Sequence, residues 1–248
     1  MASYDFNAPR LFVEAPLGPE TRLDLDRAQA NYLLNVLRLR AGESVLVFNG
    51  RDGEWRAELA VEGRKAAGLV AAERTREQTQ PLDLLYLFAP LKHARLDYMV
   101  QKAVEMGVGA LRPVFTRRTQ ASRVNRERMR ANVVEAAEQC GILSLPEILD
   151  EADLASAINA LEPDRLLVFC DENAPVANPV SALSQAGNNL PRLAVVVGPE
   201  GGFTDEERAL VARHEKCVRV SLGPRVLRAD TAAVAALAVV QAVLGDWT

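Results

Sequence analysis

The chain has few of the side chains on which enzyme active sites usually depend. Its 248 residues include two histidines, His93 and His214, so we expect neither a histidine-based metal site nor a nucleophilic triad. The three cysteines, Cys140, Cys170 and Cys217, lie far apart and form no C-x-x-C pair. This spacing argues against a zinc cluster or a disulfide framework and indicates a reducing, cytoplasmic environment.

Several sequence signals are also absent. No apolar stretch reaches the ~18 residues typical of a membrane span, and the richest one, residues 231–244, is predicted to be a buried helix. The first residues contain no basic segment followed by an apolar run, so no signal peptide and no membrane partner are expected. The G-x-x-x-x-G-K-[ST] pattern is missing, which excludes the usual phosphate-loop NTPase.

Charge is distributed unevenly along the chain. The net charge of −4 argues mildly against a nucleic-acid partner. Residues 112–130, however, contain seven arginines and one acidic residue, Glu127. Arginine suits phosphate because its planar guanidinium can donate two parallel hydrogen bonds. The cluster fits either a solvated helix face or a phosphate-binding patch, and both alternatives stay open.

The first part of the chain, residues 1–75, has the pattern of a small β-barrel with one helix. The helix is expected over residues 26–39, where apolar residues recur on one face. Residues 45–48 and 55–59 are expected to pair as a hairpin, because Asn-Gly and Asp-Gly between them favour a tight turn. The polar residues 73–80 are interpreted as a linker.

The remainder, residues 76–248, alternates strands and helices. This pattern indicates an α/β domain with a largely parallel sheet. The expected strands are residues 82–89, 111–115, 166–170, 193–197 and 218–222.

Two glycine-rich loops are the most informative feature. Val195–Thr204 and Leu222–Thr231 each run from an apolar strand through a Gly/Pro turn toward a helix. Glycines without a Cβ let backbone groups approach a flat ligand such as adenine, with Val226 and Leu227 against its faces. The alternative is that the Gly-Pro pairs only form turns. The glycines concerned are Gly198, Gly201, Gly202 and Gly223.

Several strings together carry a family resemblance. They are Gly198–Phe203, Leu222–Arg228, Gln101–Val108 and Ala136–Gly141. The chain resembles the SPOUT superfamily of S-adenosylmethionine-dependent RNA methyltransferases and, more closely, the bacterial 16S ribosomal RNA uracil-N3 methyltransferases. The resemblance implies a PUA-like RNA-binding barrel over residues 1–75 and a methyltransferase domain with a deep trefoil knot over residues 76–248. It further implies a homodimer that methylates N3 of one uridine in the 16S rRNA of the 30S subunit.

The resemblance also suggests roles for individual residues. Arg228 is predicted to stabilise the charge that spreads over uracil O2 and O4 when N3 loses its proton. Asp230, where the family more often has glutamate, is predicted to orient Arg228 or to assist proton removal. The predicted cofactor ligands are Gly198, Pro199, Glu200, Gly201, Gly202, Leu222, Gly223, Val226 and Leu227. The arginines predicted to bind RNA phosphates are Arg10, Arg112, Arg118 and Arg123.

Two other functions stay open at this point. One is a different knotted methyltransferase that acts on transfer RNA or 23S rRNA, although the barrel and the complete second-loop string argue against it. The other is a non-catalytic RNA-binding factor in ribosome assembly, which the arginine cluster supports. Binding of S-adenosylmethionine would discriminate between an enzyme and such a factor.

Overall fold

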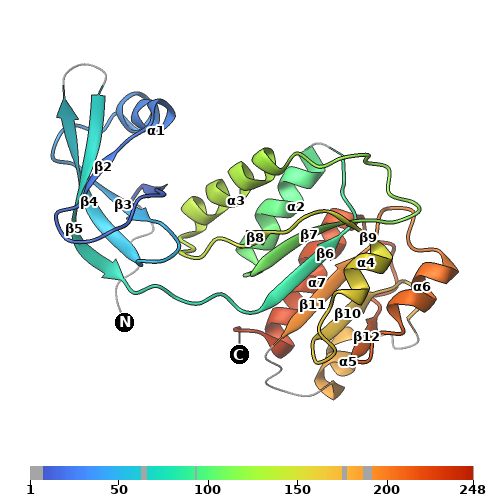
Figure 1. The fold of residues 1–248 in the computed structure, drawn as a ribbon. Coiled ribbons are helices and arrows are strands. Elements are labelled where there is room, and N and C mark those ends of the chain that lie inside the picture. The colour runs from blue at the N-terminus through green and yellow to red at the C-terminus, as the bar shows by residue number, and fades with distance from the viewer. Residues whose placement is uncertain (1–7, 63–65, 93, 175–177, 187–191, 248) are drawn as a thin grey trace. The chain divides into compact units, whose positions relative to one another are not determined.

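The chain forms two compact units. The structure, a computed structural model, describes residues 8–62, 66–92, 94–174, 178–186 and 192–247 (Figure 1). One unit comprises residues 1–80 with 137–145, and the other comprises residues 81–136 with 146–248.

The N-terminal unit is a five-stranded, mostly antiparallel sheet with the strand order β1-β3-β4-β5-β2. The predicted hairpin is confirmed, because β3 pairs antiparallel with β4 from Ser44 opposite Glu58 to Phe48 opposite Glu54. Inward-facing side chains such as Val45 and Val47 form one buried cluster. The strands are β1 (Arg10–Phe12), β2 (Arg22–Asp24), β3 (Ser44–Phe48), β4 (Glu54–Glu62) and β5 (Ala66–Arg76).

Two sequence predictions in this unit need correction. The helix expected over residues 26–39 is shorter: α1 spans Arg27–Asn31 with a capping box at Asp26, and a wider π-type turn, η1, follows over Tyr32–Val36. The expected linker begins too early, because β5 continues to Arg76. Polar residues remain in a strand here because β4 supplies their backbone partners.

A buried carboxylate holds the end of this sheet. Glu54 accepts hydrogen bonds from Arg10 Nε at 3.0 Å, Arg76 Nη2 at 2.6 Å and Thr75 Oγ1 at 2.9 Å. The Arg10 and Glu54 side chains are both only 3% exposed. Burial alone would raise the pKa of Glu54, but the bonds from Arg76, Thr75 and Arg10 outweigh it and hold the pKa below its usual value.

Replacing this carboxylate should destabilise the N-terminal unit. In Glu54→Gln, two guanidinium groups lose their counter-charge, and we expect the free energy of unfolding to fall by about 3 kcal/mol. Urea denaturation of the full chain would measure this. The matched control is Glu73→Gln, which breaks an exposed pair with Arg56 and should change stability little. Equal effects of the two variants would contradict this account.

The C-terminal unit is built on a parallel sheet, as the alternating pattern predicts. The strand order is β12-β10-β11-β6-β7-β8, and β9 pairs with β7 off this path. All of these pairings are parallel. The strands are β6 (Leu84–Phe88), β7 (Ala110–Phe115), β8 (Glu147–Ile148), β9 (Ala152–Asp153), β10 (Leu166–Cys170), β11 (Leu193–Val197) and β12 (Cys217–Val220).

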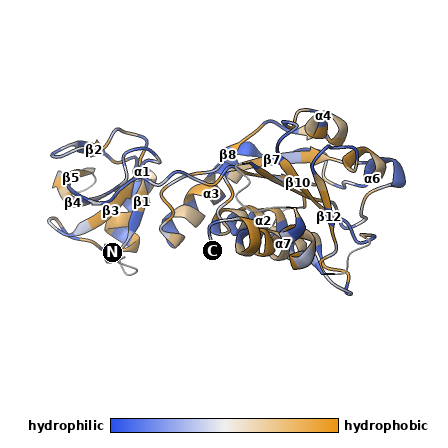
Figure 2. Cartoon of the chain, turned by 90° about the horizontal axis from the view of Figure 1, so that it is seen from below, coloured by the Kyte–Doolittle hydropathy of each residue, from blue (hydrophilic) through white to orange (hydrophobic). Residues whose placement is uncertain are grey.

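Helices lie on both faces of this sheet. Figure 2 shows α2 and α7 on one side and α4 and α6 on the other. Successive residues of a strand point to opposite faces of the sheet. In β6, Leu85 and Leu87 pack with α4, whereas Tyr86 contacts Met99 of α2. Among the described residues, no helix is both long and apolar enough to cross a membrane. The helices are α2 (Ala94–Glu105), α3 (Arg126–Cys140), α4 (Leu154–Asn159), α5 (Pro179–Gln185), α6 (Asp205–Val211) and α7 (Ala229–Leu244).

Candidate functional site

The two glycine-rich loops lie at the same edge of the parallel sheet. β10, β11 and β12 are neighbours and end at Cys170, Val197 and Val220. Because parallel strands place their carboxyl ends at one edge, the segments that follow these strands converge there. Ligands of open α/β sheets commonly bind at this position.

A cavity of about 240 Å³ lies between these segments, and we call it the loop cavity. One wall is formed by Cys170 at the end of β10 and by Asp171 and Glu172 directly after it. All of the residues predicted to bind the cofactor line the loop cavity, namely Gly198, Pro199, Glu200, Gly201, Gly202, Leu222, Gly223, Val226 and Leu227.

The first loop owes its shape to packing beneath it. A Cβ on Gly198 would lie 2.6 Å from the Phe203 ring, which is buried and meets Phe169 edge-on with ring centroids 5.2 Å apart. Any larger residue at position 198 would clash with Phe203, so the packing of the protein itself already requires glycine there. Gly202 has a φ of +68° and donates its N–H to the Pro199 carbonyl at 2.8 Å, which closes the turn.

The loop is anchored where α6 begins. Thr204 and Glu207 form the predicted capping box, and Glu207 is buried. Glu207 Oε2 accepts the Thr204 N–H in this capping box, and Glu207 Oε1 accepts the backbone N–H of Arg117 at 2.8 Å. In addition, Arg118 Nη1 donates to the Gly201 carbonyl at 2.7 Å. The segment after β7 thus holds the first loop in place through two contacts.

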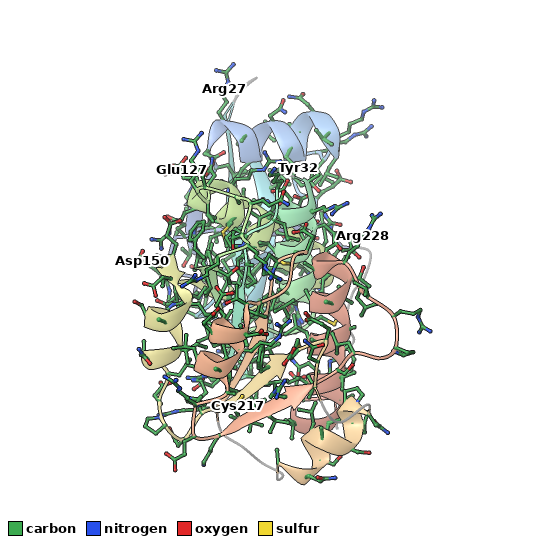
Figure 3. The ribbon with its side chains drawn as sticks, turned by 90° about the vertical axis from the view of Figure 1, so that its right-hand side faces the viewer. Arg27, Tyr32, Glu127, Asp150, Cys217 and Arg228 are labelled. Atoms are coloured by element: carbon green, nitrogen blue, oxygen red, sulfur yellow. The ribbon has the colours of Figure 1, made fainter. Side chains whose placement is uncertain are left out.

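The second loop is more open. Gly223 has a φ of +101°, and a Cβ built there would meet nothing within 4 Å. Val226 is 94% exposed, so its side chain is available to a ligand rather than packed in the core. Arg228 precedes α7 as its N-cap residue and is exposed (Figure 3). Within the described part of the chain, its guanidinium has no hydrogen bond or ion pair.

Within the described residues, Asp230 makes no hydrogen bond or ion pair with Arg228, the residue that it is predicted to orient. Asp230 lies in the first turn of α7, where its Oδ1 accepts the backbone N–H of Thr231 at 2.9 Å. This contact satisfies one backbone N–H at the start of the helix and leaves the Arg228 guanidinium without a carboxylate partner among the described residues.

A buried carboxylate that sequence reasoning missed forms the wall of the loop cavity beside β10. Asp171 accepts Arg219 Nη2 at 2.5 Å, Arg208 Nε at 3.2 Å and the Asn173 N–H at 3.0 Å. Burial would raise the pKa of Asp171, but these donors outweigh it and hold the pKa below its usual value. The sequence signal that could have identified Asp171 is its position directly after an apolar strand, β10.

Cys170, which also lines the loop cavity, is not a nucleophile at neutral pH. Burial, reinforced by the nearby Asp171 carboxylate, raises the pKa of the Cys170 thiol to about 12. The thiol therefore remains protonated and contributes an apolar wall.

The four arginines predicted to bind RNA have different surroundings. Arg10 is buried against Glu54, so it is not placed to bind phosphate. Arg112 is half-buried on β7, and its Nε has no hydrogen-bond partner among the described residues. Arg118 donates to Gly201, as described above. Arg123 is exposed and, in the described residues, unpaired, so it fits the prediction best.

A parallel α/β sheet with a backbone-lined cavity at its carboxyl edge defines a small-molecule-binding domain. Sequence comparison gives the particular family. A family model described as RNA methyltransferase domain matches residues 78–241, and one described as RNA methyltransferase PUA domain matches residues 25–70. The chain therefore belongs to the RNA methyltransferase family.

Individual relatives agree with this assignment. A protein of Synechocystis called ribosomal RNA small subunit methyltransferase E is 34% identical, with 96% of this chain and 78% of the relative covered. Its namesake in Rickettsia conorii is 29% identical over 94% of each chain. The family resemblance found in the sequence is confirmed.

Solved structures share the fold. A ribosomal RNA small subunit methyltransferase E from Neisseria gonorrhoeae, bound to S-adenosyl methionine, matches with a TM-score of 0.83 and 28% identity, covering 98% of this chain and 100% of the other. A methyltransferase from Legionella pneumophila, in complex with the same cofactor, gives a TM-score of 0.84 at 29% identity, covering 97% and 99%. The predicted α/β fold with a PUA domain is confirmed, and the trefoil knot stays a prediction.

The Asp171 network should be essential to the stability of this unit. In Asp171→Asn, the wholly buried side chain no longer neutralises Arg208 and Arg219, and we expect a loss of about 3 kcal/mol in unfolding free energy at pH 7. Chemical denaturation measures this loss. Asp164→Asn, which breaks an exposed pair with Arg192, serves as the control and should have little effect.

The pH dependence follows from the direction of the shift. The pKa of Asp171 is lower in the folded chain than its ordinary value of 3.8, so its ionisation favours the folded state above about pH 4. This stabilisation is lost as pH falls through the folded-state pKa. The difference between the native chain and Asp171→Asn should therefore shrink in acid, and a constant difference down to pH 2 would contradict the assignment.

Proposed function

We propose that the protein is an S-adenosylmethionine-dependent methyltransferase that modifies N3 of a uridine in 16S rRNA. The observation that carries this proposal is the loop cavity, where the two glycine-rich loops and the segment after β10 enclose one space. The names of the relatives support 16S rRNA as the substrate, and the resemblance in the second loop supports uracil N3 as the target atom.

The residues of the loop cavity fit such a cofactor. Leu222, Val226 and Leu227 offer apolar contacts to an adenine ring, and the loop backbones offer donors and acceptors to its edge. Glu172 and Glu200 are exposed carboxylates on the cavity wall, suited to ribose hydroxyls or to an ammonium group. When bound, S-adenosylmethionine supplies an electrophilic methyl group on its sulfonium.

Arg228 is the residue best placed to assist the reaction. Uracil N3 carries a proton that has to leave, and negative charge then spreads over O2 and O4. A guanidinium close to these oxygens stabilises that charge. The Arg228 side chain is exposed at the end of the second loop and, within the described residues, has no competing partner. Asp230, in the first turn of α7, is proposed to assist proton removal.

Removing this guanidinium should separate catalysis from cofactor binding. In Arg228→Ala, methylation should fall by about 10²–10³-fold, the usual cost of losing one charge-stabilising donor. The dissociation constant for S-adenosylmethionine, measured by calorimetry, should change little. The control is Arg213→Ala, an exposed arginine beyond the end of α6. Full turnover by Arg228→Ala would refute its catalytic role.

We further propose that the protein is a homodimer. α7 is predominantly apolar and packs on α2, α5 and β11, yet Val234, Val239 and Val243 remain only half-buried. Apolar side chains in a helix of this kind favour a further packing surface, and a second copy supplies one. Sedimentation equilibrium should give twice the chain mass of 27.0 kDa.

The substrate distinguishes this function from its alternatives. We propose that the PUA domain and the exposed Arg123 contact rRNA in the 30S subunit, which would place the protein in the cytoplasm. Purified 30S subunits lacking the modification should accept one methyl group, and mass mapping should find it on uracil N3. Methylation of transfer RNA or 23S rRNA instead would favour a different methyltransferase. No binding of S-adenosylmethionine would favour an assembly factor.

A further inference from the structure

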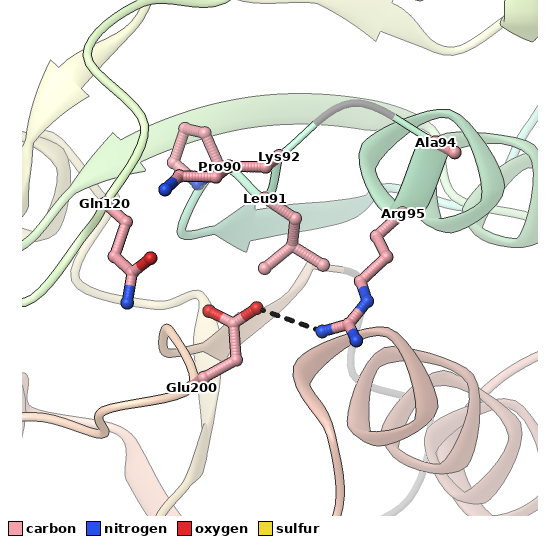
Figure 4. Close-up of a pocket in the computed structure, with 7 residues that line it drawn as sticks. All are labelled: Pro90, Leu91, Lys92, Ala94, Arg95, Gln120 and Glu200. Atoms are coloured by element: carbon pink, nitrogen blue, oxygen red, sulfur yellow. Dashed lines mark ion pairs between the residues drawn. The ribbon is translucent and has the colours of Figure 1, made fainter.

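Two further cavities lie next to the loop cavity in the same unit. The middle cavity, of about 370 Å³, is lined by the segment after β6, the start of α2, Gln120 and Glu200 (Figure 4). The outer cavity, of about 420 Å³, extends over residues 120–129. Shared wall residues give the order of the three. Glu200 lines both the loop cavity and the middle cavity, whereas Lys92 and Gln120 line both the middle cavity and the outer cavity.

The two further cavities are positively charged. The middle cavity has Lys92 and Arg95 against one carboxylate, Glu200. The outer cavity has Lys92, Arg123 and Arg128 against Asp97, which is engaged by Arg128 at 2.8 and 2.5 Å. The Lys92 ammonium and the Arg123 guanidinium have no hydrogen bond or ion pair in the described part of the chain. Two cations thus remain available to an anionic ligand.

An ion pair marks the boundary between the loop cavity and the middle cavity. Arg95 Nη1 lies 3.5 Å from Glu200 Oε1, and the two side chains are 45% and 41% exposed. A pair this open contributes little to stability. Figure 4 shows the two groups facing each other, with Gln120 reaching toward the same space from another segment. The pair therefore places a guanidinium beside the first loop without being needed to fold it.

We propose that the middle cavity receives the target pyrimidine nucleotide and that the outer cavity receives the phosphodiester next to it. This inference rests on the proposed function and deepens it. The buried Leu91 gives the middle cavity an apolar surface for the base. The Gln120 side-chain amide, which has no hydrogen bond among the described residues, can donate to a pyrimidine carbonyl oxygen. Lys92 and Arg123 bind the flanking phosphates, since both line the outer cavity.

The arrangement has a chemical reason. A base paired in a stack cannot present N3 to a cofactor, so it has to leave the stack and enter a pocket next to that cofactor. The middle cavity meets this requirement because it shares Glu200 with the loop cavity. Through its ion pair, Glu200 holds the Arg95 guanidinium beside the middle cavity. Glu200 is therefore a positioning residue that acts through Arg95, in addition to lining the loop cavity.

The phosphate contacts are tested with Lys92→Met and Arg123→Met. With 30S subunits that lack the modification, each variant should raise the KM for subunits about tenfold. The plot of log affinity against log salt should become less steep by roughly 0.7–0.9, the contribution of one phosphate contact. The dissociation constant for S-adenosylmethionine should stay within about twofold. Arg192→Met is the matched control, because Arg192 precedes β11 and lies at the opposite edge of the sheet.

Contact with the base is tested with Gln120→Ala. This variant should reduce kcat/KM about tenfold while leaving the salt slope unchanged, because an amide neutralises no phosphate. A salt slope that falls as in Lys92→Met, or an unchanged kcat/KM, would overturn the assignment of the middle cavity to the base.

The role of Glu200 is tested by a double-mutant cycle with Arg95. The measurements use saturating S-adenosylmethionine, so that a contact of Glu200 with the cofactor does not contribute. If Glu200 then acts through Arg95, Glu200→Gln, Arg95→Met and the double variant should lower kcat/KM for 30S subunits by the same factor, and Arg95→Lys should recover most of it. Independent, multiplying effects would overturn this role.

The two levels of inference fail in different ways. If the native chain methylates 30S subunits but Lys92→Met, Arg123→Met and Gln120→Ala match it in KM, kcat/KM and salt slope, the proposed cavities are wrong and the proposed function stands. If the native chain binds no S-adenosylmethionine and transfers no methyl group to these subunits, the proposed function fails and the cavity assignment fails with it.

Discussion

The candidate site depends most on the ion pairs that the Asp171 carboxylate makes. This carboxylate lies directly after β10 and bonds Arg208 of α6 and Arg219 of β12. The first loop ends at α6 and the second loop begins after β12, so one side chain fixes the ends of both loops with respect to the sheet. A buried charge of this kind is tolerated only because several donors surround it. The loop cavity exists because those donors come from the elements that carry its walls.

The parallel sheet could be predicted because its strands are nearly continuous apolar runs, buried on both faces. The expected strands over residues 166–170 and 193–197 match β10 and β11. The short helices α4 and α5 were missed, because six or seven residues contain too few turns to show a helical period. The helix expected over residues 26–39 was too long, since an apolar stripe does not distinguish an α-helix from a π-type turn.

The candidate site was predictable where its signal is local. Glycine and proline directly after apolar strands identified both loops, and convergence of the strand ends brought those loops together. Long-range pairing was not predictable: nothing near Arg10 in the sequence indicates that its partner, Glu54, lies 44 residues away. The reason for Gly198 was likewise hidden, because only the packed structure places Phe203 beneath it. Lys92 and Gln120 carry no motif, and only the cavities that they share connect them with the loops.

Burial separates the structural arginines from those available to a ligand. Arg10 and Arg208 are enclosed and satisfied by carboxylates, so their energy belongs to the fold. Arg123 and Arg228 are exposed and, among the described residues, unpaired, so they contribute nothing comparable to stability. A substrate phosphate or a developing negative charge would find these two groups without first displacing a protein carboxylate. In the proposed assignment, the order outer cavity, middle cavity, loop cavity would lead RNA from the exposed cations to the glycine-rich loops.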